Sequence, residues 1–131
     1  MKYNETKIRV RYGETDQMGV VYHANYVKYF EIGRTEWLRC YGITYKETEE
    51  KGIIMPVISL QVNYKKSAVY DEVIQVKTSL LRLPKASIEF AYEITNIAGD
   101  ILATGSTILA FVDADKNRPT RCPKFLLEAI A

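Results

Sequence analysis

The segment Gly13–Tyr26, GETDQMGVVYHANY, contains the residues whose types and spacing could support chemistry. Asp16 is followed by Gly19 and by His23, the only histidine of the chain, just before a predicted helix. A helix N-terminus presents free N–H groups and roughly half a positive charge, so it can polarise a carbonyl. A carboxylate beside it can attack that carbonyl or take a proton from an attacking water. The spacing therefore fits acyl transfer, and it equally fits an Asp16 that only orders a turn beside a His23 that packs over the helix start.

The rest of the composition argues against several other kinds of site. One histidine and two distant cysteines, Cys40 and Cys122, cannot supply the usual ligands of a zinc site and do not predict a disulfide framework. The sequence has no G-x-S-x-G nucleophile elbow and no Gly-rich phosphate loop. A net charge of only +2, with no basic block, argues against a nucleic-acid partner. We therefore expect no metal, no prosthetic group and no nucleic acid.

Length and composition predict one soluble globular domain over residues 1–131. Hydrophobic residues make up 47% of the chain and charged residues 26%, which is the balance of a protein that buries one core. The start of the chain, MKYNETKIRV, has no apolar region of the kind that marks a secretory signal. The stretch 101–112 is interrupted by polar residues and is much shorter than the roughly 20 apolar residues of a membrane helix. We expect no membrane span and a cytoplasmic location.

Periodicity and turn signals predict five strands and two short helices. Alternation with a period of two predicts strands at residues 6–11, 58–65, 74–80, 88–94 and 101–112. The last of these is apolar or small on both faces, which favours a central position in the sheet. Mostly short turns join the last four strands, which indicates antiparallel neighbours. A T-x-x-E capping box at Thr44 and the proline at position 123 predict short helices that end before Gly52 and cover residues 124–130.

Between the first two strands the period changes to that of a long helix. Aromatic residues from Tyr26 to Tyr41 fall on one face, Asn25 or a neighbour can cap the start, and Gly42 suits the end. Gly33 inside this helix costs about 1 kcal/mol against alanine, so we expect it to let the helix approach another element closely. One aromatic helix and a sheet with one apolar face pack as helix on sheet, which is an α+β fold.

At these residues the sequence also resembles a known family. The stretch Asp16–Tyr26, followed by Tyr29, Glu31 and Arg34, resembles the hot-dog-fold acyl-CoA thioesterases of the 4-hydroxybenzoyl-CoA thioesterase type. It looks closest to the branch named after the Tol–Pal cell-envelope gene cluster. The shared pattern is D-x-x-G-x-V-x-x-x-x-Y-x-x-x-x-x-x-x-R, directly before the long helix. The resemblance implies a hot-dog fold, in which an antiparallel five-stranded sheet wraps around one long helix.

The resemblance also implies roles for individual residues. Asp16 matches the catalytic carboxylate of the family, and His23 stands where a backbone N–H at the helix start polarises the thioester carbonyl. A second subtype carries its carboxylate on the long helix after an H-G-G-type motif. That motif is missing here, so Glu31 is expected to be a solvated or dimer-contact residue. The substrate-binding residues implied in the same way are Gly19, Tyr22, Asn25, Tyr26, Ser59, Arg82 and Lys85.

Coenzyme A would need cations near its phosphates. Arg82 and Lys85 lie in the turn between the third and fourth strands, where the family often carries basic residues. Lys65 and Lys66, at the end of the second strand, are the other candidates. By resemblance, residues 54–59 would line the acyl pocket, although their apolar side chains suit a core equally well.

The resemblance therefore implies an acyl-CoA thioesterase that hydrolyses a thioester to a free acid and coenzyme A without a cofactor. Asp16 would act as nucleophile or as general base. Two alternatives stay open. One is a dehydratase of the same fold, which would rely on a catalytic histidine and a partner acid across the subunit interface. The other is a non-catalytic module that binds acyl-CoA or acyl carrier protein, for which Asp16 would have no use.

A five-stranded sheet with one helix leaves an exposed edge, and exposed edges are usually covered or paired. In the resembled family, the strand after the helix, here residues 53–65, pairs with its own copy, and the active site lies between subunits. We therefore expect a homodimer or homotetramer whose small-molecule partner is an acyl-CoA substrate.

Overall fold

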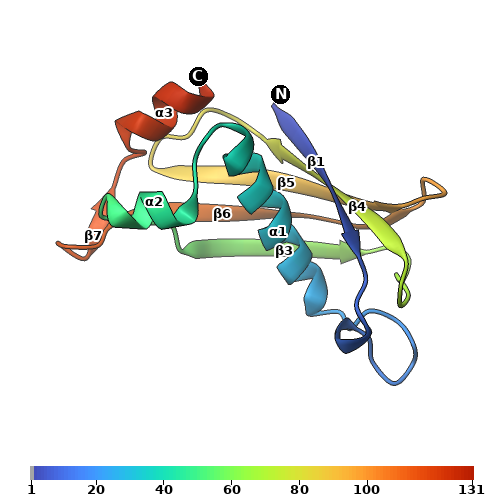
Figure 1. Ribbon diagram of the computed structural model, residues 1–131. Coiled ribbons are helices and arrows are strands. Elements are labelled where there is room, and N and C mark those ends of the chain that lie inside the picture. Colours follow the sequence, from blue (N-terminus) through green and yellow to red (C-terminus); the bar gives the residue numbers. More distant parts are fainter. Residues whose placement is uncertain (1) are drawn as a thin grey trace.

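The computed structural model describes residues 2–131 as an antiparallel sheet with one long helix against it (Figure 1). The strands are β1 (Tyr3–Arg9), β2 (Ile53–Ile54), β3 (Val57–Tyr64), β4 (Val73–Leu80), β5 (Ser87–Asn96), β6 (Ile101–Asp113) and β7 (Arg118–Thr120). The helices are α1 (Asn25–Cys40), α2 (Tyr45–Glu50) and α3 (Lys124–Ile130), with a 3-10 turn, η1 (Tyr12–Glu14). The predicted α+β class is confirmed.

Strand β6 is the centre of the sheet, as its two apolar faces predicted. It pairs with β5 on one side and with β3 on the other, and β4 and β1 follow beyond β5. Two short strands, β2 and β7, extend the five predicted ones by pairing with the end of β6. They have two and three residues, and β7 contains Pro119, so neither could show an alternating pattern.

Strand β1 begins and ends earlier than its apolar alternation predicted. The prediction covered residues 6–11, whereas β1 pairs with β4 from Tyr3, opposite Ser79, to Arg9, opposite Val73. The residues before Thr6 are polar or exposed, so side-chain burial does not hold them in the strand. Backbone hydrogen bonds to β4 hold them instead.

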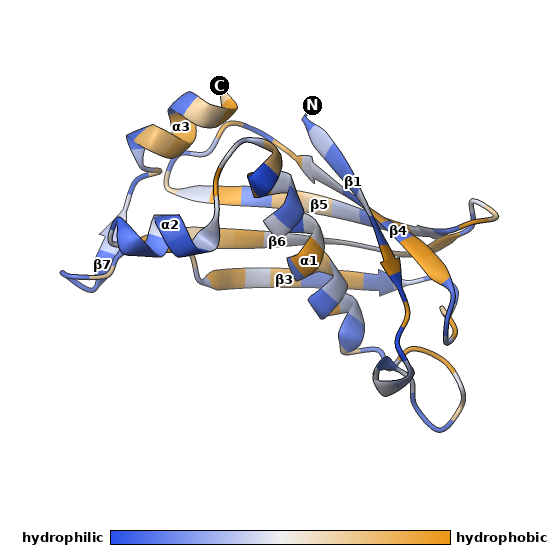
Figure 2. Cartoon of the chain, viewed as in Figure 1, coloured by the Kyte–Doolittle hydropathy of each residue, from blue (hydrophilic) through white to orange (hydrophobic). Residues whose placement is uncertain are grey.

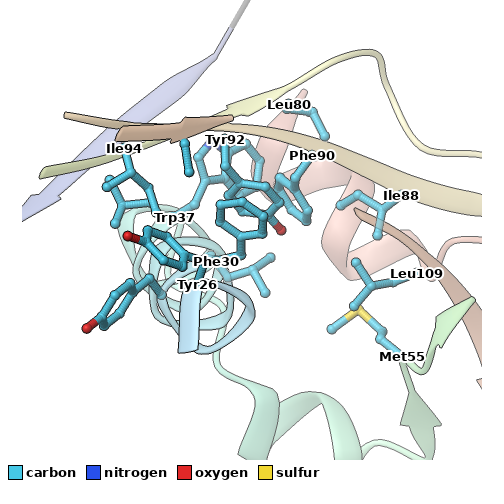
Figure 3. Packing of buried hydrophobic residues seen from close by; sticks show 14 of the residues in the cluster. Tyr26, Phe30, Trp37, Met55, Leu80, Ile88, Phe90, Tyr92, Ile94 and Leu109 are labelled. Carbon is cyan, nitrogen blue, oxygen red and sulfur yellow. The ribbon is translucent and has the colours of Figure 1, made fainter. Parts of the chain in front are cut away.

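Helix α1 lies across one face of the sheet, and its aromatic residues form the centre of the core (Figures 1 and 3). Phe30 stacks on Tyr92 with ring centroids 4.3 Å apart and an interplanar angle of 8°. Trp37 meets Phe90 edge to face at 5.1 Å. These four side chains are buried, so the aromatic face of the helix supplies much of the apolar area that stabilises the fold.

Gly33 allows α1 to approach β4 closely, as its place in the helix predicted. A Cβ atom built on Gly33 would lie 2.8 Å from Val76 Cγ1 and would also overlap the Thr78 hydroxyl. Both contacts are shorter than van der Waals separation, which is about 3.5–4.0 Å between carbon atoms. The absence of a side chain at Gly33 therefore sets the spacing between helix and sheet.

Strand β3 lies at one edge of the sheet, and β1 forms the opposite edge. Apolar and polar residues alternate along β3 (Figure 2). Among its large apolar side chains, Val57, Ile58, Leu60 and Tyr64 are all exposed, Ile58 by 62%. The described residues place no second strand on the outer side of β3. An uncovered apolar edge of this kind is unusual for a protein that stays monomeric.

We predict that Gly33→Ala destabilises the protein by about 1–3 kcal/mol, because the new methyl group forces α1 away from Val76. Urea unfolding followed by circular dichroism measures the free energy of unfolding of wild type and variant. The control is Gly13→Ala, since a Cβ there meets nothing within 4 Å. Equal stability of the Gly33 and Gly13 variants would show that helix spacing does not depend on Gly33.

Candidate active site

Asp16 lies at the tip of a tight hairpin between η1 and α1. The backbone N–H of Asp16 donates to the carbonyl of Val20 at 2.9 Å, and Thr15 bridges to Val21. The N–H of Gly19 returns to the carbonyl of Asp16 at 3.0 Å and closes a four-residue turn. Gly19 has φ +79°, a left-handed conformation that glycine adopts without strain, so the predicted glycine of the turn has a definite backbone role.

The carboxylate of Asp16 is only partly used by this turn. Its Oδ1 accepts a hydrogen bond from the N–H of Met18 at 2.9 Å, which orders the turn as an aspartate commonly does. Over residues 2–131 no donor contacts Oδ2, and the side chain is of intermediate exposure. One oxygen therefore holds the turn while the other is free to meet a substrate or a water.

The N-terminus of α1 supplies the second half of the site. Its N-cap is Ala24, which makes no side-chain cap, and no acceptor among the described residues takes the backbone N–H of His23 or Ala24. The Tyr64 hydroxyl donates to the His23 carbonyl at 2.9 Å and holds the helix start against the end of β3. Free N–H groups at a helix start are suited to an oxyanion or a polarised carbonyl.

The predicted capping role of Asn25 is wrong. Asn25 is the first helical residue, one position too late to cap, and its side-chain amide instead donates to the Glu14 carbonyl at 2.8 Å.

The two halves meet at one hollow of about 280 Å³. Asp16 and His23 both line it, and Tyr26 lies beneath them on the first turn of α1. The Tyr26 hydroxyl accepts the backbone N–H of Ala68 at 3.1 Å, which ties the helix to the segment after β3. Burial raises the pKa of Tyr26, so this hydroxyl stays protonated. Tyr64, Lys65, Lys66 and Ser67 complete the wall from the other side.

The arrangement of strands, helix and loop is shared with proteins of known family. Residues 10–130 match the family model described as thioesterase-like superfamily. The chain belongs to this superfamily. The match, together with the structural neighbours, confirms the predicted hot-dog fold.

Relatives in the thioesterase-like superfamily cover almost the whole chain. The Bacillus subtilis protein named "Putative acyl-CoA thioesterase YneP" is 36% identical over 95% of this chain and 90% of its own length. Acyl-CoA thioester hydrolase YbgC of Escherichia coli O157:H7 is 30% identical over 92% of this chain and 90% of its length. The crystal structure of a DHNA-CoA thioesterase from Staphylococcus aureus superposes with a TM-score of 0.88 at 43% identity, over 92% of this chain and 81% of that one.

Not every predicted substrate-binding residue of this thioesterase-like chain lies at the hollow. Tyr22 is 47% exposed and packs on the His23 ring, with centroids 4.4 Å apart. Ser59 lies near the start of β3, five residues before Tyr64, and pairs with Ile108. The site wall and Ser59 are therefore at opposite ends of the same strand.

Arg82 and Lys85 are also distant from Asp16 within one protomer. They follow the end of β4, whereas the start of β4 is the end that lies near the hairpin. Eight residues of strand separate those ends by roughly 25 Å. Arg82 forms an ion pair with Glu89 on the neighbouring strand. Lys65 and Lys66 lie on the hollow itself, and Lys66 is paired with Asp100 at 2.9 Å.

Two residues of the site were not singled out by sequence patterns. The sequence pattern indicated only that Tyr64 is one apolar position of a predicted strand. It indicated only that Glu14 is a polar residue of a loop. Glu14 is in fact buried and bonded to Lys28 and Tyr29 of α1. A charge pair between a loop and a helix fourteen residues later leaves no periodic signal in a single sequence.

Residues 2–131 contain no group of three or more His, Cys, Asp or Glu side chains that could hold a metal ion. Arg34, the last residue of the sequence motif, is buried away from the hollow, and its Nε donates to the Tyr45 hydroxyl at 3.0 Å. None of the described helices is long and apolar enough to cross a bilayer.

Proposed function

We propose that the protein is an acyl-CoA thioesterase and that residues 1–131 act as one thioesterase domain. The observation that carries this proposal is that Asp16 and His23 line the same hollow, where Oδ2 of Asp16 has no donor and the backbone N–H of His23 has no acceptor among the described residues. The names of the relatives support it, since two of them are called acyl-CoA thioesterase or thioester hydrolase. No metal or prosthetic group is required, because the backbone and one carboxylate supply the electrostatics.

The proposed reaction begins with the thioester carbonyl oxygen at the N–H groups of the α1 start. With Asp16 as general base, the free oxygen takes a proton from water while the water oxygen bonds to the carbonyl carbon. The negative charge on the carbonyl oxygen is held by the helix N-terminus. The carbon–sulfur bond then breaks, and the coenzyme A thiolate takes the proton from Asp16. With Asp16 as nucleophile, the carboxylate attacks the carbonyl carbon and the carbon–sulfur bond breaks, which expels the coenzyme A thiolate. Water then hydrolyses the resulting anhydride to the free acid and the Asp16 carboxylate, and the proton released goes to the thiolate.

We place the active carboxylate on the hairpin, as in the 4-hydroxybenzoyl-CoA type and the Tol–Pal-named branch of these enzymes, and not on the long helix. The motif D-x-x-G-x-V before α1 supports this assignment. Glu31 is exposed and lies one and a half turns into α1, and it does not line the hollow of Asp16. The assay panel includes aliphatic and aromatic acyl-CoAs, because the S. aureus relative is named as a DHNA-CoA thioesterase.

We further propose that the active unit is a homodimer formed through β3. A homotetramer would consist of two such dimers. The support is the exposed apolar edge of that strand. In an antiparallel pair of identical strands, the start of one lies beside the end of the other. Ser59 of the partner subunit would then approach Tyr64 and the hollow. The same two-fold arrangement brings the far end of the partner's sheet, with its basic turn, toward this active site.

The first prediction concerns Asp16. Asp16→Asn keeps the shape and the acceptor for the Met18 N–H, but it can neither attack nor accept a proton. Turnover should fall roughly 100-fold or more with little change in the Michaelis constant. Steady-state thiol release measures this, and circular dichroism confirms folding. His23→Ala should lose much less, since alanine retains the backbone N–H.

Glu31→Gln is the matched control for this prediction, because it also removes one carboxylate but from a position on α1 that does not line the hollow. A folded Asp16→Asn with normal turnover beside an inactive Glu31→Gln would contradict the site assignment. If wild type binds acyl-CoA or acyl carrier protein and hydrolyses no acyl thioester, the protein is a binding module.

The second prediction concerns the phosphates of coenzyme A. Replacing Arg82 and Lys85 together by Ala should raise the Michaelis constant about tenfold and flatten its dependence on salt. Turnover should stay nearly constant, since phosphate contacts hold ground and transition states alike. The test is steady-state kinetics over a range of ionic strength. An unchanged Michaelis constant would indicate that Lys65 and Lys66 bind the phosphates instead. Replacing both of these lysines by Ala then tests that assignment.

The third prediction concerns assembly. Ile58→Glu places a charge on the exposed side of β3 and should weaken the dimer while leaving the protomer folded. Ile97→Glu is the control, because Ile97 is 84% exposed but lies in the turn after β5. Light scattering at micromolar concentration measures the mass of each variant. A wild-type protein that is monomeric and fully active would exclude the dimer.

A further inference from the structure

Glu14 is a buried carboxylate for which the proposed reaction has no direct use. Its side chain is only 5% exposed. Oε1 accepts the Arg11 N–H and the Tyr29 hydroxyl, both at 2.9 Å, and Oε2 accepts Lys28 Nζ at 2.9 Å. A buried charge is costly in free energy unless it is paired and hydrogen-bonded. The Glu14 carboxylate meets this condition, because all of these donors bind it.

The backbone of Glu14 joins the same two parts of the molecule. Its carbonyl accepts the N–H of Tyr22, at the base of the hairpin, at 2.9 Å. It also accepts the side-chain amide of Asn25, the first residue of α1, at 2.8 Å. Through its main chain and its carboxylate, Glu14 thus contacts both strands of the hairpin and the first turn of the helix.

The carboxylate of Glu14 is held in its charged form. Burial by itself would raise the pKa, but the hydrogen bonds from the Arg11 N–H, Lys28 and Tyr29, with the Lys28 charge, outweigh it and leave the pKa below its ordinary value of 4.5. In turn, burial and the bond to Glu14 raise the pKa of Tyr29, so this hydroxyl remains a donor. The network is therefore complete at neutral pH and loses its central charge only in acid.

We propose that Glu14 is a positioning residue for the reaction. Asp16 belongs to the hairpin and the N–H donors belong to α1, so their separation depends on how the hairpin sits on the helix. The Glu14–Lys28 pair and the Tyr29 bond set that separation, so that the carboxylate and the N–H donors address the same carbonyl. The inference rests on the proposed thioesterase function, because it assigns Glu14 a task within that site.

The chemistry of a positioning residue predicts a distinct kinetic effect. A displacement of about 1 Å between reacting groups can cost 100-fold in rate. The substrate would still bind, since the coenzyme A contacts do not involve Glu14. Loss of the Glu14 charge should therefore lower kcat about 10- to 100-fold and change KM by about twofold or less.

The experiment compares Glu14→Gln with Lys28→Met and with the double variant. Glutamine keeps the size of the side chain and an acceptor for Tyr29, but it loses the charge that Lys28 pairs with. We expect each single variant to lower kcat, and the double variant to lower it no further, because both changes break one interaction. Leu126→Ala is the control for general loss of stability, since Leu126 is a fully buried residue of α3, a helix distant from the hairpin (Figure 1).

Two further readouts test whether the Glu14 charge holds the hairpin on α1. Amide hydrogen exchange at Asp16 and Tyr22, whose N–H groups donate across the hairpin to Val20 and Glu14, should accelerate in Glu14→Gln and stay unchanged in Leu126→Ala. The stability difference between wild type and Glu14→Gln should be fully present above pH 4.5 and should disappear as pH falls through the lowered pKa of Glu14. Both readouts are independent of turnover.

The outcomes are distinguishable. A normal kcat in Glu14→Gln, or a kcat loss of the same size in Leu126→Ala, overturns the positioning role. If the losses of kcat in the two single variants add up in the double variant, the Glu14–Lys28 ion pair is not the basis of the positioning role. If wild type shows no thioesterase activity, the proposed function fails, while hydrogen exchange still decides whether Glu14 holds the hairpin on α1.

Discussion

The close packing of α1 on the sheet is the constraint on which the rest of the structure depends. Phe30 stacks on Tyr92 at 4.3 Å where Gly33 lets the helix approach β4 and Gly105 of β6 leaves room for the Phe30 ring. This contact buries the aromatic face of the helix and fixes its direction across the strands. The N-terminus of α1 is thereby brought to the end of β3, where the Tyr64 hydroxyl meets the His23 carbonyl.

The position of the helix start in turn decides what the hairpin can do. A carboxylate on a free loop would have no fixed relation to the N–H groups of the helix. Here the loop is a hairpin of residues 14–22. Its base is bonded to the first turn of α1 through the Glu14 carbonyl, and Val21 is bonded to Ala68. The same helix thus organises the core through its aromatic face and the site through its first turn. Stability and geometry of the site are coupled through one element.

Sequence periodicity was a good guide to the fold and a partial guide to the site. Burial of side chains generates the alternation of β4 to β6 and the aromatic face of α1, so those elements were predictable. Where backbone pairing alone decides, as at Tyr3–Glu5 of β1 and in β2 and β7, no side-chain pattern exists to be seen. The capping of α1 was mispredicted because Asn25 found a partner in Glu14, a long-range contact that local propensity does not contain.

The location of Asp16 and His23 beside one another was predictable from motif spacing, but the wall opposite them was not. Tyr64 and Lys65 come from the end of β3, about forty residues later, and reach the hollow only through sheet pairing. This wall is the uncovered edge of the protomer, so the hollow opens to solvent at the place where electrostatic stabilisation needs a low dielectric. A second β3 against that edge would cover apolar side chains and close the hollow at once. The proposed pairing of two copies would therefore cover the exposed strand and shield the open hollow together.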